Sequence, residues 1–328
     1  MESEQKFQIL WQKLPDSKAR LLRVFGESGE FMVPESIEGY VITEIGSYCF
    51  SKVSQIPSDS KSYFTYLTKT AQKEMLVECS GDFLEKVTLP ETIEKIDRSA
   101  FYNCRNMKSL SIGKNVSEIG SDAFMNCFQF CELTIHAKVT DKTALKAILS
   151  QISSDMQVCF AIQGEISARL FYPEYYEAYD EIAPAHIFGR KITGEGFRAR
   201  QSFKEGIIDF SQYDLVFPKA CIEESVKTLG KIALNRLYYP VFLQQKSKKI
   251  YETYIVENQK EIVQNLIQKK ELFLLEFLCE NKYLLKETLV EAVSKTSAIN
   301  WAEGTASLLQ WKNLYYMEKK SRYEFDLF

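Results

Sequence analysis

The residues best suited to chemistry lie between positions 188 and 203, where cations and glycines alternate. The cations are Arg190, Lys191, Arg198 and Arg200, and Gly194 and Gly196 lie among them. Guanidinium and ammonium groups, together with glycine backbone N–H groups, can hold a phosphate or an acidic peptide. However, the Gly-x-Gly follows no clear strand and precedes no Gly-Lys-Ser/Thr, so neither nucleotide-binding fingerprint is matched. This segment is therefore predicted to be either an anion-binding site or a structured loop. Its residues favour a helix followed by a turn or loop.

A second candidate is a group of carboxylates in the preceding tyrosine-rich segment. Its members are Glu174, Glu177, Asp180 and Glu181, with His186 nearby. Spacings of three and four would place carboxylates on one helix face, as a metal site or an acid–base pair requires. Pro184 would end that helix before His186, and tyrosines fill its other face. We therefore interpret the carboxylates as a solvated helix face opposite a tyrosine core.

Histidine and cysteine usage argues against most catalytic centres. His136 and His186 are the two histidines in 328 residues, which disfavours zinc hydrolases, triads and histidine-based proton transfer. The eight cysteines show no Cys-x-x-Cys spacing. Cys104, Cys127 and Cys131 could form a metal site or a disulfide, but free cysteine also packs as a small buried hydrophobe. We predict no catalytic residue, no metal site and no cofactor.

Composition and charge narrow the classes of partner. The chain is 45% hydrophobic and 26% charged, which is typical of a folded protein. Its net charge of −3 offers no basic footprint for nucleic acid. No apolar run approaches the roughly 20 residues that span a bilayer. The N-terminal segment also lacks the pattern of a signal peptide, so we expect a cytoplasmic protein with reduced thiols.

The elements that position these residues follow from a register that is repeated after 23 residues. Leu84, Val87, Leu89, Ile93, Ile96, Ala100, Phe101 and Cys104 recur in type as Met107, Leu110, Ile112, Val116, Ile119, Ala123, Phe124 and Cys127. Alternating apolar residues predict strands over 84–89, 107–112 and 130–135. A fixed period of this length is typical of a solenoid.

The 23-residue pattern is less regular in the residues before and after these two repeats. Upstream, 31–34 and 42–50 resemble a worn repeat, and an insertion at about 51–75 separates it from the next repeat. Strands are also expected at 20–25, 63–67 and 158–162, with a capping helix at 144–149. We therefore expect about four coils within residues 1–160.

The remaining residues predict helices. Helical spacing appears at 172–179, 188–203 and 219–238, within a helical middle region at 161–245. Residues 246–328 favour short helices at 261–269, 272–279, 286–294 and 300–314. Leu278 and Leu309 lie 31 residues apart, which suggests two stacked helical hairpins.

The pattern Leu-x-x-Val-x-Leu-Pro-x-x-Ile-x-x-Ile-x-x-x-Ala-Phe-x-x-Cys at 84–104 resembles the BspA-like (Treponema-type) bacterial leucine-rich repeat. Val33–Gly46 resembles the opening repeat of that family. The resemblance implies a short right-handed solenoid with a concave β-sheet, used for adhesion to a protein or ligand. The helices at 246–328 resemble ankyrin-type hairpins, without the Thr-Pro-Leu-His signature. The expected fold is α+β: a short leucine-rich-repeat β-solenoid followed by an all-α helical-repeat region.

The alternation of the three strands also predicts a binding surface. Neighbouring strands lie about 4.8 Å apart, so their outward side chains should form a small polar face. These side chains are Lys86, Thr88, Ser109, Ser111, Glu132 and Thr134. The face either binds a partner or is simply solvated. We expect a non-catalytic interaction or scaffold protein with a protein partner; the alternative is an enzyme, or an anion- or nucleotide-responsive regulator, with its site in 165–245.

Overall fold

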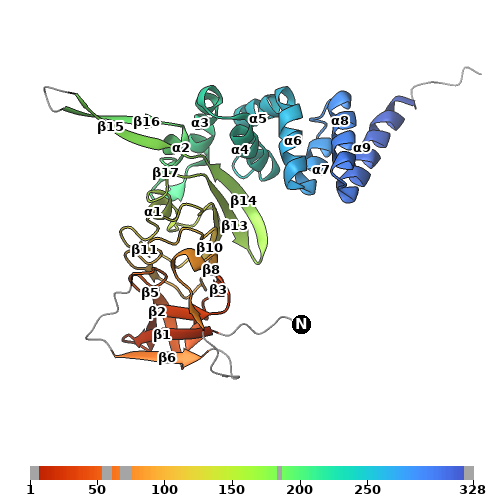
Figure 1. Ribbon diagram of the computed structural model, residues 1–328. Coiled ribbons are helices and arrows are strands. Elements are labelled where there is room, and N and C mark those ends of the chain that lie inside the picture. Colours follow the sequence, from red (N-terminus) through yellow and green to blue (C-terminus); the bar gives the residue numbers. More distant parts are fainter. Residues whose placement is uncertain (1–6, 54–60, 67–75, 183–186, 321–328) are drawn as a thin grey trace, which may run out of the picture. The chain divides into compact units, whose positions relative to one another are not determined.

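The computed structural model describes residues 7–53, 61–66, 76–182 and 187–320. The chain divides into two compact units, Met1–Tyr213 and Asp214–Phe328, and the boundary falls within helix α3 (Phe210–Glu223) (Figure 1). The three parts expected from sequence, 1–160, 161–245 and 246–328, stay a prediction. The expected fold class is confirmed, because a β-solenoid precedes a helical region.

The solenoid is built on one parallel sheet. Its strands are β3 (Glu30–Met32), β8 (Lys86–Thr88), β10 (Ser109–Gly113), β12 (Glu132–His136) and β13 (Met156–Ile162), followed by the antiparallel β14 (Glu165–Tyr172). We call it the parallel sheet. The described coils make about five turns, one more than expected, because β13 continues the stack beyond the last recognisable repeat. The strands predicted at 84–89, 107–112, 130–135 and 158–162 are confirmed.

A second sheet covers the other side of the solenoid and extends to the N-terminal strands (Figure 1). The short strands β5 (Tyr40–Ile45), β9 (Lys95–Ile96) and β11 (Glu118–Ile119) stack in parallel, one from each coil. Next to β5 lie β2 (Lys18–Gly26), β1 (Phe7–Lys13) and β6 (Ser62–Tyr66), while β4 (Ser36–Ile37) pairs with β5 and β7 (Val77–Glu78) with β2. The strand expected at 20–25 is confirmed as part of β2. Most of the insertion at 51–75, including Leu67, lies outside the described residues.

A row of phenylalanines fills the space between the two sheets. Phe50, Phe101 and Phe124 stack at centroid distances of 4.9 and 5.4 Å, nearly parallel, and Phe130 continues the row. The compact turn that holds each ring uses left-handed backbone at equivalent positions. These positions are Ser99 and Asp122, and then Asn103 and Asn126, with φ between 53° and 63°. The 23-residue repeat is therefore a repeat of backbone conformation as well as of core residues.

The first unit ends in short elements that depart from the expected helices. After η1 (Gly81–Phe83) and the capping helix α1 (Leu145–Leu149), the chain forms the hairpin β15 (Tyr176–Ile182) and β16 (Ile187–Thr193). Helix α2 (Gly196–Ala199) and strands β17 (Phe203–Lys204) and β18 (Ile207–Ile208) follow. Of the elements named in this paragraph, the sequence predicted only the capping helix.

The helices predicted over 172–179 and 188–203 are therefore wrong. Glutamates and tyrosines at these spacings also fit a strand, and antiparallel pairing of Tyr179 with Arg190 decides the conformation. Gly194 has a φ of 94°, which stops any helix from running through this segment. Tyr176 and Tyr179 are 63% and 65% exposed and do not belong to the expected tyrosine core, whereas Tyr172 is fully buried. Pro184 and His186 lie outside the described residues.

The second unit consists of antiparallel helices. They are the rest of α3, then α4 (Val226–Tyr238), α5 (Gln245–Glu257), α6 (Gln259–Lys269), α7 (Leu272–Glu280), α8 (Lys286–Ala298) and α9 (Ala302–Lys320). The four helices predicted beyond residue 260 are confirmed. Side-chain hydrogen bonds join residues 31 apart: Tyr283 to Glu252, Lys295 to Gln264, and Ser307 to Glu276. The helical hairpins thus stack with a 31-residue repeat, while their kinship to ankyrin repeats stays a prediction.

Candidate functional site

The outward side of the parallel sheet carries two straight rows of side chains, which we call the polar face. Ser109 lies opposite Lys86 on one side and Glu132 on the other, and Ser111 lies between Thr88 and Thr134. The structure thus brings all six side chains predicted from sequence onto one surface. They point outward because the residues between them are buried in the core: Val87, Leu110 and Leu133.

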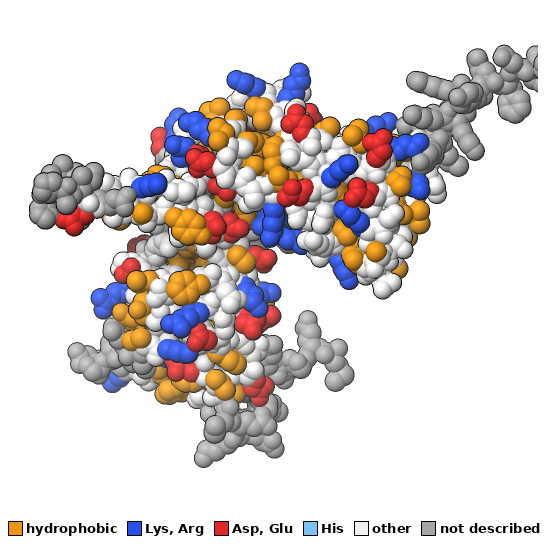
Figure 2. All heavy atoms as spheres, turned by 45° about the horizontal axis from the view of Figure 1, so that its top comes forward, with side chains coloured by type: hydrophobic (Ala, Val, Ile, Leu, Met, Phe, Trp, Pro, Cys, Tyr) orange, Lys and Arg blue, Asp and Glu red, His pale blue; other side chains and the backbone are white. Residues whose placement is uncertain are grey.

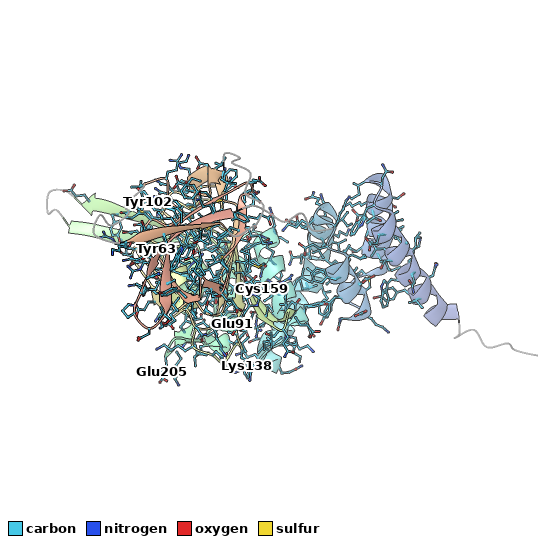
Figure 3. The ribbon with its side chains drawn as sticks, turned by 90° about the horizontal axis from the view of Figure 1, so that it is seen from below. Tyr63, Glu91, Tyr102, Lys138, Cys159 and Glu205 are labelled. Atoms are coloured by element: carbon cyan, nitrogen blue, oxygen red, sulfur yellow. The ribbon has the colours of Figure 1, made fainter. Side chains whose placement is uncertain are left out.

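The structure lengthens both rows at each end. Strand β3 adds Glu30 and Met32, β13 adds Gln157 and Cys159, and β14 adds Arg169 opposite Cys159. Figure 3 labels Cys159 on β13. Met32 is 70% exposed and supplies an apolar side chain at one end of the face. Sequence reasoning matched 31–34 to the repeat strand but did not name Glu30, Met32 or Arg169 as residues of this face.

Several side chains of the polar face interact with one another or with residues at its border. Lys86 Nζ lies 3.8 Å from Glu30 Oε2, and both side chains are largely exposed. Ser111 Oγ and His136 Nε2 are 2.8 Å apart, so His136 borders the face. Burial raises the pKa of the Cys159 thiol, and the nearby Arg169 opposes this rise. A thiol of raised pKa is a poor nucleophile at neutral pH, so Cys159 suits contact rather than catalysis.

The four cations of the predicted anion site have different interaction partners. Arg200 is buried and donates to the carbonyl oxygens of Ile152 (2.9 Å), Ser154 (2.6 Å), Gly196 (3.1 Å) and Pro173. Its guanidinium also lies over the ring of Tyr175 at 5.1 Å. Burial lowers the pKa of Arg200 to about 10. These contacts tie α2 and the segment just before the hairpin to the loop after α1, so Arg200 acts as a structural residue.

The other three cations do not converge with Arg200. Arg190 forms a two-point ion pair with Glu177 (2.6 and 3.1 Å), which lowers the pKa of that carboxyl. Arg198 pairs with Glu195, and Lys191 is exposed on β16. Anion binding at these positions stays a prediction.

The acidic and cysteine clusters form no metal centre in the described part of the chain. There, no group of three or more His, Cys, Asp or Glu side chains is placed to hold an ion. Cys104 and Cys127 are buried free thiols that point at the carbonyl oxygens of Phe50 and Phe101. Cys131 is exposed. The interpretation of Cys104 and Cys127 as packed structural thiols is therefore confirmed.

Figure 2 shows acidic and basic side chains interspersed on the face in view. Among the described helices, none is both long and apolar enough to cross a bilayer.

Comparison with known families identifies the solenoid. Residues 69–144 match the family model described as "BspA type Leucine rich repeat region", in 6 copies. This part of the chain is similar to BspA-type leucine-rich repeat regions. The match covers less than half of the chain, and it confirms the resemblance first seen at 84–104. Repeats of this type generally serve protein interaction, and the polar face lies on the BspA-type coils and their neighbours.

One solved structure resembles the chain in part. It is a leucine rich cell surface protein from Faecalibacterium prausnitzii A2-165, 22% identical, and the match covers 39% of this chain and 28% of that one. The TM-score is 0.27, too low to support a conclusion about function. No curated protein matches the chain. The BspA-type repeat is thus the firmest link to known proteins.

Proposed function

We propose that this chain is a non-catalytic interaction module that binds another protein through the polar face. The observation that carries the proposal is the in-register stacking of β3, β8, β10, β12 and β13, which lines up outward side chains from successive coils. A solenoid presents such a surface without any further folding, and its BspA-type repeats belong to a class used mainly for protein binding.

The chemistry of the face suits a mixed, largely polar partner surface. Lys86, Glu132 and Glu30 are exposed charges of both signs, while Ser109 and Ser111 are small and leave room for side chains from the partner. Met32 offers an apolar contact, and contacts that are shielded from water usually dominate binding energy. We therefore expect the strongest contacts at the Met32 end of the face.

Photo-crosslinking tests the location of the binding surface. A photoreactive amino acid is placed at Thr88 or Thr134 on the polar face and, as a matched control, at Glu118 on the short strand β11 of the opposite sheet. Irradiation in an extract of the native cells should give one crosslinked protein from both polar-face positions. The control position should give none.

A substitution pair then tests the energetics with the protein so identified. Ser109→Arg places a bulky charge in the middle of the face and should weaken binding at least tenfold, a loss of about 1.4 kcal/mol. Glu118→Arg is equally bulky, lies off the face and should leave the dissociation constant unchanged. Circular dichroism checks that both variants fold. Full binding by Ser109→Arg, or crosslinking from Glu118 alone, would contradict the proposal.

Three further expectations remain predictions. They are the cytoplasmic location, the lack of a nucleic-acid partner, and the alternative of an anion- or nucleotide-responsive site in 165–245. The last is tested by thermal shift with nucleotides and inorganic phosphate. Because Arg200 is structural, the informative variants are Arg190→Gln and Lys191→Gln.

A further inference from the structure

Three aromatic rings surround one ammonium group on the N-terminal strands. Lys13 Nζ lies 4.5 Å from the ring centroid of Tyr63, 4.7 Å from that of Tyr40 and 6.0 Å from that of Trp11. The rings also contact one another, because the centroid of Trp11 is 5.4 Å from that of Tyr40 and 5.2 Å from that of Tyr63. We call Trp11, Tyr40 and Tyr63 the aromatic cage. Tyr63 is labelled in Figure 3.

Strand pairing builds the cage from three separate strands. Trp11 and Tyr63 are direct partners across the β1–β6 pair, and Tyr40 begins β5 on the far side of β2. Lys13 follows Trp11 by two residues, so both side chains leave β1 on the same side. Lys13 is also the last residue of β1, just before a turn with left-handed backbone at Asp16. The lysine therefore lies at the mouth of the cage.

The floor of the cage is held in place by hydrogen bonds. Trp11 is fully buried, and its indole N–H donates to Thr65 Oγ1 at 3.0 Å. The Thr65 hydroxyl in turn donates to Glu38 Oε1 at 2.6 Å. These hydrogen bonds hold the indole in place and link its N–H through Thr65 to a carboxylate. Aromatic faces carry negative potential, so the cage attracts a cation before any ligand arrives.

Lys13 is an imperfect occupant of this site. A primary ammonium has three N–H donors. Within the described residues, no acceptor forms a hydrogen bond or ion pair with Lys13 Nζ. A quaternary ammonium group has no N–H to satisfy, and its methyl groups can contact all three rings at once. We propose that the aromatic cage binds a quaternary ammonium group, and that the Lys13 side chain occupies the cage in its absence.

Titration of the Trp11 indole signal by NMR tests this proposal. Choline is the probe, and 3,3-dimethylbutanol, which has the same shape without the charge, is the control ligand at constant ionic strength. Trp11→Phe assigns the indole N–H signal. Choline should shift it, and the neutral alcohol should not. Lys13→Ala removes the internal competitor, so its affinity for choline should be about tenfold tighter than that of the wild type if the cage is open about a tenth of the time.

Ring variants separate the cage from simple surface binding. In the Lys13→Ala background, Tyr63→Phe keeps the aromatic face and should retain choline binding, whereas Tyr63→Leu should lose it at least fivefold. Lys114→Ala, at an exposed lysine outside both proposed binding surfaces, should leave choline binding at the level of the parent protein. Unchanged Trp11 signals in Lys13→Ala at high choline, or equal binding of the neutral alcohol, would overturn the assignment.

Two sources could supply the same chemical group, namely a free quaternary amine and a lipid headgroup. Sedimentation with phosphatidylcholine vesicles distinguishes them, with phosphatidylglycerol vesicles as the control. Binding to choline but to neither vesicle assigns the cage to free amines. Binding to choline and to phosphatidylcholine vesicles alone assigns it to the headgroup. The site is distinct from the polar face, so this outcome does not depend on the proposed function.

Discussion

Replacing Phe101 by leucine should destabilise the solenoid more than the same change at Phe130. Both side chains are fully buried in the same row of rings. Phe101 lies between two stacked neighbours, Phe50 at 4.9 Å and 7° and Phe124 at 5.4 Å and 9°. Phe130 contacts Phe124 at 5.4 Å with a tilt of 33°. The pair of variants therefore compares the centre of the row with its end.

The expected magnitudes follow from these contacts. An aromatic pair contributes about 0.5–1.5 kcal/mol beyond the area that it buries, so losing two pairs at Phe101 costs about 1–3 kcal/mol. The smaller leucine side chain adds about 1 kcal/mol of lost burial at either position. Phe101→Leu should therefore lower the free energy of unfolding by about 2–4 kcal/mol. Phe130→Leu should lose about 0.5–1.5 kcal/mol less, because it gives up a single pair.

Hydrogen exchange is the appropriate assay because the two units need not unfold together, and a single transition would then mislead. Exchange is followed by mass spectrometry in peptides spanning 84–135 of the full chain, as a function of urea. Neighbouring coils stabilise one another in a solenoid, so Phe101→Leu should speed exchange in the coils on both sides of it. Equal losses from the two variants, or a larger loss from Phe130→Leu, would refute the reasoning from ring contacts.

Three further changes have defined outcomes. Asp214→Asn should cost about 3–5 kcal/mol by hydrogen exchange of the surrounding peptides as a function of urea, because it strips the buried Arg236 of its ion partner at 2.7 and 3.0 Å. Gly120→Ala should cost about 1–3 kcal/mol in the same assay, since a Cβ would lie 2.2 Å from the Arg98 backbone nitrogen of the preceding coil. Burial raises the pKa of the Cys79 thiol to about 12, above about 8.5 when unfolded. The folded state thus holds the proton more tightly, and stability should fall as pH rises from about 9 towards 12 by at most about 1.4 kcal/mol per pH unit. Cys79→Ala should show a shallower fall between pH 8 and pH 10.

The solenoid could be predicted from sequence because each coil fills equivalent core positions with the same residue types. Phe101 and Phe124 stack on each other, and Ala100 and Ala123 are buried beside them. Such short-range constraints repeat every 23 residues and leave a visible pattern. The fifth turn was missed because β13 has the required alternation but follows α1 and not a repeat turn.

The hairpin β15–β16 could not be predicted because its conformation depends on pairing across a connection. Glu174, Glu177 and Glu181 fit a helix by local spacing alone. The strand register places Glu177 near Arg190, and their ion pair forms across the two strands. The structural role of Arg200, which the sequence suggested as an anion-binding residue, could not be predicted for a related reason. Its carbonyl partners at Ile152, Ser154 and Pro173 come from segments that no local pattern connects to it.

The two surfaces proposed for binding differ in how the fold produces them, and this difference explains which one the sequence revealed. The polar face is a direct product of the repeat, because Lys86, Ser109 and Glu132 occupy one register position in successive coils. The aromatic cage forms outside the recognisable repeats, where β1, β6 and the first residue of β5 lie at the N-terminal end of the stack. Core positions must stay alike for coils to stack, whereas the terminal strands are free to vary because they pack on one side only. Specific recognition in this chain should therefore concentrate at the ends of the solenoid, and variants of Tyr63 should change ligand binding without changing the exchange rates of 84–135.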